Sequence, residues 1–275
     1  MKLASILILT VCTAGSVLSQ SDVTWVASTG TNNVNCFRTT PCATFAQALA
    51  ATNVNGVIKV VDAAEYGEVA ITKNVSIDGN GSGAVIDAGS FCCAGITINN
   101  PGGQVTIRNL TIRVSSGGFD GIDITGGDVH LENVLILGTP TSGVLADGAS
   151  NPVHLSMKNV TVTNARWGIN IKGASVSLRD SVIRGGFDGI SVIPSAGRAA
   201  VALLERCELS YNSNVGLAVD NTAGGGATAR VSDTVITGNG TGIVTFSGAQ
   251  IISFRTNMLA GNTTDGATPF SISLK

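Results

Sequence analysis

The sequence has few charged residues, few aromatic residues and almost no histidine. Charged residues make up 12% of its 275 residues, the net charge is −2, aromatic residues make up 4%, and there are two histidines. Such a chain has no basic surface for phosphate groups, so we expect no nucleic-acid partner. Beyond the N-terminal residues no apolar run is long enough to cross a membrane, so we expect no membrane span.

Glycine, in contrast, is abundant. The chain has 35 glycines in 275 residues, whereas average usage is about 7%. Apolar residues still make up 44% of the chain. This composition is typical of an ordered protein with many tight turns.

The first 19 residues have the pattern of a secretory signal peptide. Lys2 precedes an apolar segment, and the small residues that follow predict cleavage after Ser19. We therefore expect a secreted protein, extracellular or periplasmic, whose cysteines meet an oxidising environment. Cys36 and Cys42 flank a short loop and are expected to form a disulfide. The pairing of Cys92, Cys93 and Cys207 stays open, and the odd number leaves at least one thiol unpaired.

Two motifs recur about every 24 residues along most of the chain. The first is a glycine that is mostly followed by Ile, Val or Leu; its glycines are Gly95, Gly121, Gly143, Gly168, Gly189, Gly216, Gly242 and Gly266. The second alternates apolar and other residues, as strands do, and then often has Asn or Asp. These residue types tolerate a left-handed bend. We expect them to stack at Asn109, Asn133, Asn159, Asp180 and Asp233, with Arg206 and Thr256 breaking the row.

Each repeat is thus three short strands and three turns, without a helix. Stacking such units predicts an all-β fold, a single-stranded right-handed parallel β-helix of about 8–9 coils of ~24 residues. The coils span residues 57–275, and residues 20–56 form one domain with them through an N-terminal strand and a capping helix. We expect Thr40 as the N-cap of that helix and Pro41 at its first position. The C-terminal coil has no comparable cap, which makes self-association through it possible.

The segments "TWVASTGTNNVNCFRTTPCATFAQAL" and "NGVIKVVDAAEYGEVAITKNVSIDGNG", followed by the coils, resemble the pectate-lyase-like β-helix superfamily. More closely, residues 23–275 look like exported bacterial β-helix proteins of mostly unassigned function. The resemblance implies the fold and not an activity, because the superfamily includes lyases, hydrolases, epimerases and adhesins. The catalytic segments "NTD", "GHG", "RIK" and "WIDH" of its enzymes are missing, so no catalytic residue is carried over. Calcium occurs in the superfamily, but its motif is missing too, and we expect no cofactor.

The strands that begin at the repeated glycines present polar residues outward in two columns. Asp123 and Asn170 belong to one column, Asp147 and Lys172 to the other. Asp123 and Asp147 should lie about 8 Å apart, within the range of inverting glycosidases. The simpler interpretation is a solvated pair of Asp147 and Lys172 among scattered surface acids, because Lys172 would lower the pKa of Asp147. We favour this interpretation over a binding or catalytic patch.

Three further features were weighed in the same way. Trp167, beside Asp188, is either a platform for a sugar ring or local packing over the turn. His130 and His154 face outward near Asp128; a zinc site is one interpretation, solvated histidines the default, and we assign no metal. The hexapeptide "GGFDGI", at 117–122 and 185–190, is read as a turn whose aspartate binds backbone and whose phenylalanine fills the coil corner.

The leading hypothesis is therefore a secreted β-helix that binds a polysaccharide or cell-surface glycan along its flank, with no catalysis demonstrable. Its candidate binding residues are Asp123, Asp147, Trp167, Asn170, Lys172 and Asp188. The alternative is a polysaccharide lyase or glycoside hydrolase that acts on an acidic polysaccharide. A further alternative is a structural or adhesive rod.

Overall fold

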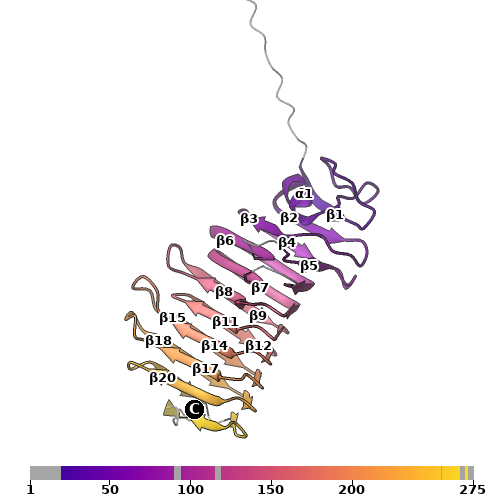
Figure 1. Ribbon diagram of the computed structural model, residues 1–275. Coiled ribbons are helices and arrows are strands. Elements are labelled where there is room, and N and C mark those ends of the chain that lie inside the picture. Colours follow the sequence, from indigo (N-terminus) through magenta and orange to yellow (C-terminus); the bar gives the residue numbers. More distant parts are fainter. Residues whose placement is uncertain (1–19, 90–93, 115–118, 255, 267–269, 272–275) are drawn as a thin grey trace, which may run out of the picture.

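The protein is a rod of stacked parallel strands in a computed structural model that describes residues 20–89, 94–114, 119–254, 256–266 and 270–271 (Figure 1). Every pairing between named strands is parallel, and each strand pairs with its counterpart one coil away (for example, β11 with β8 and β14). This is the parallel β-helix that the repeats predict. Residues 1–19, which carry the expected signal peptide, lie outside the described residues. No described helix is long and apolar enough to cross a membrane.

The strands form three faces. The first face contains β3 (Val69–Ile71), β8 (Ser142–Asp147), β11 (Trp167–Lys172), β14 (Asp188–Ile193), β17 (Val215–Asp220), β20 (Thr241–Phe246) and β23 (Thr264–Gly266). The second contains β1 (Ser21–Val26), β2 (Thr52–Val60), β4 (Val75–Asp78), β9 (Val153–Lys158), β12 (Ser175–Arg179), β15 (Ala200–Glu205), β18 (Ala227–Ser232), β21 (Gln250–Ser253) and β24 (Phe270–Ser271). The third contains β5 (Val85–Asp87), β10 (Thr161–Thr163), β13 (Val182–Arg184), β16 (Glu208–Ser210), β19 (Val235–Thr237) and β22 (Met258–Leu259). The long strands β6 (Ile96–Arg113) and β7 (Ile122–Leu137) contribute to all three faces.

The core is made of aliphatic side chains that stack in columns inside the rod. One column on the first face is Ile96, Ile122, Val144, Ile169, Ile190, Leu217 and Ile243, each at most 3% exposed. Burial of one such side chain stabilises the fold by about 1.5–3 kcal/mol. The period-two pattern of the sequence therefore points the apolar residues inward and leaves the alternate positions for the outer faces.

The glycine of the repeat motif is required by this close stacking. A Cβ added at Gly168 would lie 2.2 Å from Cγ2 of Ile183 and 2.5 Å from the carbonyl oxygen of Gly189. Only a residue without a side chain fits between the corner of one coil and the strand of the next.

A short helix lies at the N-terminal end of the rod (Figure 1). Helix α1 spans Phe45–Ala51 and buries Phe45 and Leu49. Its N-cap is Thr44, whose hydroxyl accepts a hydrogen bond from the Gln47 amide, so the expected N-cap at Thr40 is wrong. The Cys42 amide donates to the Trp25 carbonyl, which holds the segment around Pro41 extended against β1. The helix can begin only after that pairing ends.

Asn and Asp side chains form a ladder at the corner between the second and third faces, as predicted. Asn109, Asn133 and Asn159 have positive φ angles of 53–58°. The Asn133 amide donates to Asn109 at 3.1 Å, and the Asn159 amide donates to Asn133 at 2.7 Å. A side-chain amide thus joins each coil to the next.

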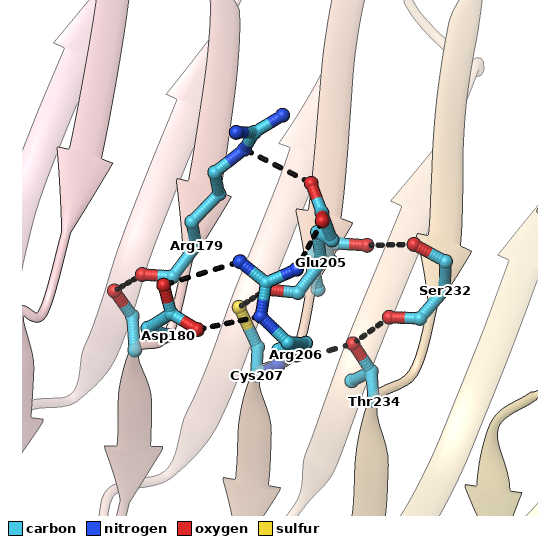
Figure 2. Close-up of polar contacts among 9 residues, drawn as sticks. Arg179, Asp180, Glu205, Arg206, Cys207, Ser232 and Thr234 are labelled. Carbon is cyan, nitrogen blue, oxygen red and sulfur yellow. Dashed lines mark hydrogen bonds and ion pairs between the residues drawn. The ribbon is translucent and has the colours of Figure 1, made fainter.

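Arg206 continues this ladder, contrary to the expectation that it breaks the row. It has a φ of 52°, and its guanidinium lies between Asp180 and Glu205 (Figure 2). Its Nε donates to Asp180 at 2.7 Å. The hydrogen bond with Arg206 holds the pKa of Asp180 below its ordinary value. A long charged side chain therefore replaces the amide contact by an ion pair.

A second ladder, which the sequence analysis missed, lies inside the rod at the corner between the third and first faces. Asn212 and Asn239 are each 1% exposed. The Oδ1 of Asn239 accepts from the backbone N and the Nδ2 of Asn212, at 3.0 and 2.9 Å. Asn262 accepts from Asn239 in the same way, at 2.9 Å for both bonds. The signal was in the sequence: each Asn precedes a repeat glycine by three or four residues.

The described cysteines agree with the sequence analysis. Cys36 and Cys42 form a disulfide, with their Cα atoms 4.8 Å apart. Cys207 is a free thiol that is 3% exposed and belongs to the core. Its burial raises the pKa of the thiol, so Cys207 acts as a small core residue. Cys92 and Cys93 lie outside the described residues.

Candidate functional site

The candidate site is on the outer surface of the first face, across β7, β8, β11 and β14. The register confirms the column in which Asp123 pairs with Leu145, Leu145 with Asn170, and Asn170 with Ser191. Lys172 pairs with Asp147, as predicted. The column of Asp147 and Lys172 is irregular toward its N-terminal end, because a register shift after Ile98 pairs Asn99 with Gly126. Asp123, Asp147, Asn170 and Lys172 are thus brought onto one surface.

Asp123 is the most perturbed carboxyl group of this surface. Burial raises its pKa from 3.8 to about 6. The negative charges of Asp120 and Asp147 raise it further, and the charge of Lys172 opposes them. Its Oδ1 is buried and has no hydrogen-bond partner among the described residues. An unpaired carboxyl with a raised pKa is a feature that occurs more often at functional sites than elsewhere.

Asn170 also has a buried side-chain oxygen without a hydrogen-bond donor in the described part of the chain. It points outward, yet it is only 7% exposed. Its Oδ1 is buried, and no described group donates a hydrogen bond to it. Asn170 is one of the predicted binding residues, but its burial could not be read from the alternating pattern, which places it outside.

Lys172 and Asp147 are neighbours in register but do not form the expected ion pair. Within the described residues no carboxylate lies within 4.0 Å of the Lys172 ammonium. Asp147 instead accepts a hydrogen bond from the Ala149 amide at 2.9 Å, at the turn that follows β8. The site therefore presents a free ammonium beside the buried carboxyl of Asp123.

Trp167 lies in register with Asp188 on the next coil and Ser142 on the previous one. It is partly exposed, and the guanidinium of Arg166 lies 4.5 Å from the centre of its ring. This cation–π contact covers part of the indole and fixes its orientation. Trp167 is therefore an aromatic surface of fixed orientation at the edge of the site.

The aspartates of the two copies of "GGFDGI" make the same kind of hydrogen bond in their two coils. Asp120 accepts hydrogen bonds from the hydroxyl of Thr141 and the amide of Ser142, both at 2.7 Å. Asp188 accepts from the Nδ2 of Asn214 at 2.7 Å and from the amide of Val215 at 3.3 Å. Each aspartate thus ties its corner to the next coil.

The phenylalanines of these copies were expected to fill the coil corners, but they do not. Phe119 and Phe187 are each 49% exposed. Each phenylalanine directly precedes the aspartate, and both rings lie at the edge of the first face.

His130, His154 and Asp128 lie on the second face, away from this site. His154 pairs in register with Asp128, as predicted, while His130 pairs with Ser156. Among the described residues no cluster of three His, Cys, Asp or Glu side chains is suited to hold a metal ion.

The stacked parallel strands define a β-helix with polar columns on its outer faces. The chain belongs to the right-handed β-helix family: the family model "Right handed beta helix region" matches residues 94–263. No curated protein matches the sequence.

Two solved structures are similar to this chain. The crystal structure of pectate lyase Pel9A is 16% identical, with a TM-score of 0.57, and the match covers 93% of this chain and 80% of that one. The Azotobacter vinelandii mannuronan C-5 epimerase AlgE6 A-module is 13% identical, with a TM-score of 0.37, over 92% of this chain and 89% of that one. The likeness to pectate lyase Pel9A confirms the parallel β-helix fold.

Proposed function

We propose that the protein binds a polysaccharide along its first face, with Asp123 and Asn170 at the centre of the site. The observation that carries this proposal is the pair of buried oxygens without a hydrogen-bond donor, one on each residue. Such oxygens destabilise the fold by about 1–3 kcal/mol each. A ligand with hydroxyl groups would donate the missing hydrogen bonds, and sugars carry these groups at every unit.

The charges around the site favour a neutral glycan over an acidic one. The carboxylates of Asp120 and Asp147 lie near Asp123, and Asp188 lies beside Trp167; Lys172 and Arg166 are the cations of this surface. A uronate polymer would bring further negative charge to this surface. Trp167, held by Arg166, supplies an apolar surface for the C–H face of a sugar ring.

A second candidate function, glycoside hydrolysis, is favoured by the pKa of Asp123. A general acid must be protonated near the working pH, and a pKa of about 6 meets this requirement. Asp147 would be the second carboxylate, at a spacing of about 8 Å from the strand geometry, which suits an inverting mechanism. In this mechanism Asp123 protonates the leaving oxygen, and Asp147 takes a proton from the attacking water.

We also propose that the protein is exported. The disulfide between Cys36 and Cys42 persists in oxidising compartments. The fold likeness to a pectate lyase is compatible with an extracellular protein. Edman sequencing of the protein secreted by its host tests the cleavage after Ser19; an uncleaved N-terminus or a cytoplasmic pool would contradict it.

Binding is tested with the purified protein on a panel of immobilised polysaccharides, neutral and uronate-containing. We expect retention on at least one neutral polysaccharide, and weaker retention in Asp123→Ala and in Asn170→Ala. Asp233→Asn, at the exposed corner, is the matched control and should bind like the wild type. The proposal is wrong if no polysaccharide retains the protein or if both site variants bind unchanged.

Catalysis is tested on the polysaccharide that binds, by release of reducing ends. If the second function holds, the rate falls as the pH rises above about 6, because Asp123 loses its proton there. If the protein retains the polymer and no new reducing ends appear, the protein binds the polymer without hydrolysing it.

A further inference from the structure

A long hollow lies on the second face, on a different side of the rod from the site above. Its volume is about 570 Å³. It is lined by two adjacent outward columns, Gln104, Asp128, His154, Ser175 and Val201 in one, and Thr106, His130, Ser156, Ser177 and Leu203 in the other. These columns cross five successive coils, or roughly 20 Å at the ~4.8 Å spacing of paired strands.

The side chains that line the hollow have free hydrogen-bonding groups. His130, His154, Ser156, Ser175 and Ser177 make no side-chain hydrogen bond to another described residue. Hydroxyl and imidazole groups can each donate and accept. Serine side chains are short, so the three serines leave space above the strands where longer residues stand elsewhere. The hollow is therefore a row of unused donors and acceptors in an open groove.

The charges of the lining do not favour an anionic ligand. No Lys or Arg lines it, and Asp128 is its only carboxylate. The next outward column carries the cations Lys158 and Arg179, but Glu132 and Glu205 neutralise them at 3.4 and 2.9 Å. A phosphate or uronate polymer would find no cation in the lining itself; the exposed Arg230 lies one coil beyond Leu203, outside the hollow.

The shape of the hollow and its apolar C-terminal end indicate which kind of ligand fits. Val201 and Leu203 lie together at the C-terminal end, and Leu203 is 37% exposed. They can pack against C–H groups while the serines and histidines bind hydroxyls. A groove of this length that is open along the rod accommodates a linear polymer better than a compact small molecule.

We propose that this hollow is a second binding site, specific for a neutral linear glycan. It is separate from the first face and does not depend on the function proposed there. A rod with sites on two faces could hold two segments of polymer at once, which raises its apparent affinity for a multivalent surface.

The two histidines allow a direct test, because the chain has only two and both line the hollow. Their Cε1–H signals in ¹H–¹³C NMR spectra report on this groove alone, and His130→Gln assigns them. The probes are neutral gluco-, xylo- and manno-hexasaccharides. We expect at least one probe to shift both signals along one saturation curve. A uronate hexasaccharide should shift neither.

Variants separate this site from the first face. Ser177→Trp fills the hollow from an outward position, and it should weaken binding at least about tenfold, or roughly 1.4 kcal/mol. Gln250→Trp, on the same face but outside the hollow, should leave the ligand-induced shifts of the histidine signals unchanged.

Three results would overturn the proposal. The first is that none of the neutral probes moves either signal. The second is that Ser177→Trp retains the shifts, which would place the ligand elsewhere. The third is that the signals move with protein concentration alone, which would make this face a contact between copies of the chain. Loss of binding on the first face, measured by retention on polysaccharide, leaves these signals unaffected.

Discussion

The corners of the rod and its first face both carry polar residues in rows, but the two regions differ in how these residues are paired. At the corners, Asn133 and Asn239 each bind the coil on either side. On the first face, Asp123 and Asn170 each have a buried oxygen without a donor. Corner residues therefore stabilise the stack, whereas those of the first face destabilise it. A polar group that costs stability is best explained by a ligand that completes its hydrogen bonds.

The largest effect is expected at the interior corner, for Asn239→Ala. The change removes an acceptor for Asn212 and a donor to the Leu209 carbonyl, which is 2.9 Å from Asn239 Nδ2. Leaving such buried groups without partners should lower the free energy of unfolding by about 2–4 kcal/mol. Urea denaturation measures it. Asn221→Ala, at an outer turn, is the control and should cost about 1 kcal/mol or less. Equal losses for the two variants would contradict a special role for the interior ladder.

The first face should respond in the opposite direction, for Asp123→Asn. Because folding raises the pKa of Asp123 from 3.8 to about 6, the folded state binds the proton more tightly than the unfolded state. The wild type therefore loses stability as the pH rises through that window, and the loss is complete above about pH 6. Allowing for the partial exposure of the group, we expect a loss of about 1–2 kcal/mol.

The asparagine variant cannot ionise, so its stability should not fall in the same window. Urea denaturation of both proteins at pH 4, 5, 6 and 7 gives the comparison. Near neutral pH the variant should be the more stable protein. Parallel pH profiles for the two proteins would show that Asp123 is solvated in the folded state.

Asn170→Ala should separate binding from stability. The change removes an oxygen that has no partner, so the free energy of unfolding should change by less than about 1 kcal/mol. Retention on polysaccharide should nevertheless fall. A loss of stability as large as that of Asn239→Ala would mean that Asn170 belongs to the structural network.

The sequence predicts the fold well because its determinants repeat. Alternation fixes which residues point inward, and the glycine that precedes Ile169 fixes where each coil restarts. The register that pairs Asp123, Leu145 and Asn170 follows from the same repeats. Even the free thiol of Cys207 could be placed inside, because its column is otherwise apolar or small.

The chemical state of the site could not be predicted in this way. Alternation places Asn170 outside, but only the three-dimensional surroundings make it 93% buried, since its exposed fraction is 7%. Register makes Lys172 a neighbour of Asp147, yet side-chain rotamers decide whether an ion pair forms. The helix start was missed at Thr44 because a tertiary pairing of Cys42 with β1 overrides the local capping signal.

The smallest effect is expected at the exposed corner, for Arg206→Asn. Asn adopts the left-handed conformation more readily than Arg and can donate to Asp180 as Asn159 donates to Asn133. It loses the ion pairs with Asp180 and Glu205, which are exposed and therefore weakened by solvent screening. The two terms oppose each other, so stability should change less than in any variant above. Arg206→Leu keeps the backbone cost without either contact and should be the less stable variant. Urea denaturation at low and high salt resolves the terms, because salt screens the ion pairs of the wild type only. If the wild type is no more sensitive to salt than Arg206→Asn, the corner is held by its backbone conformation and not by charge.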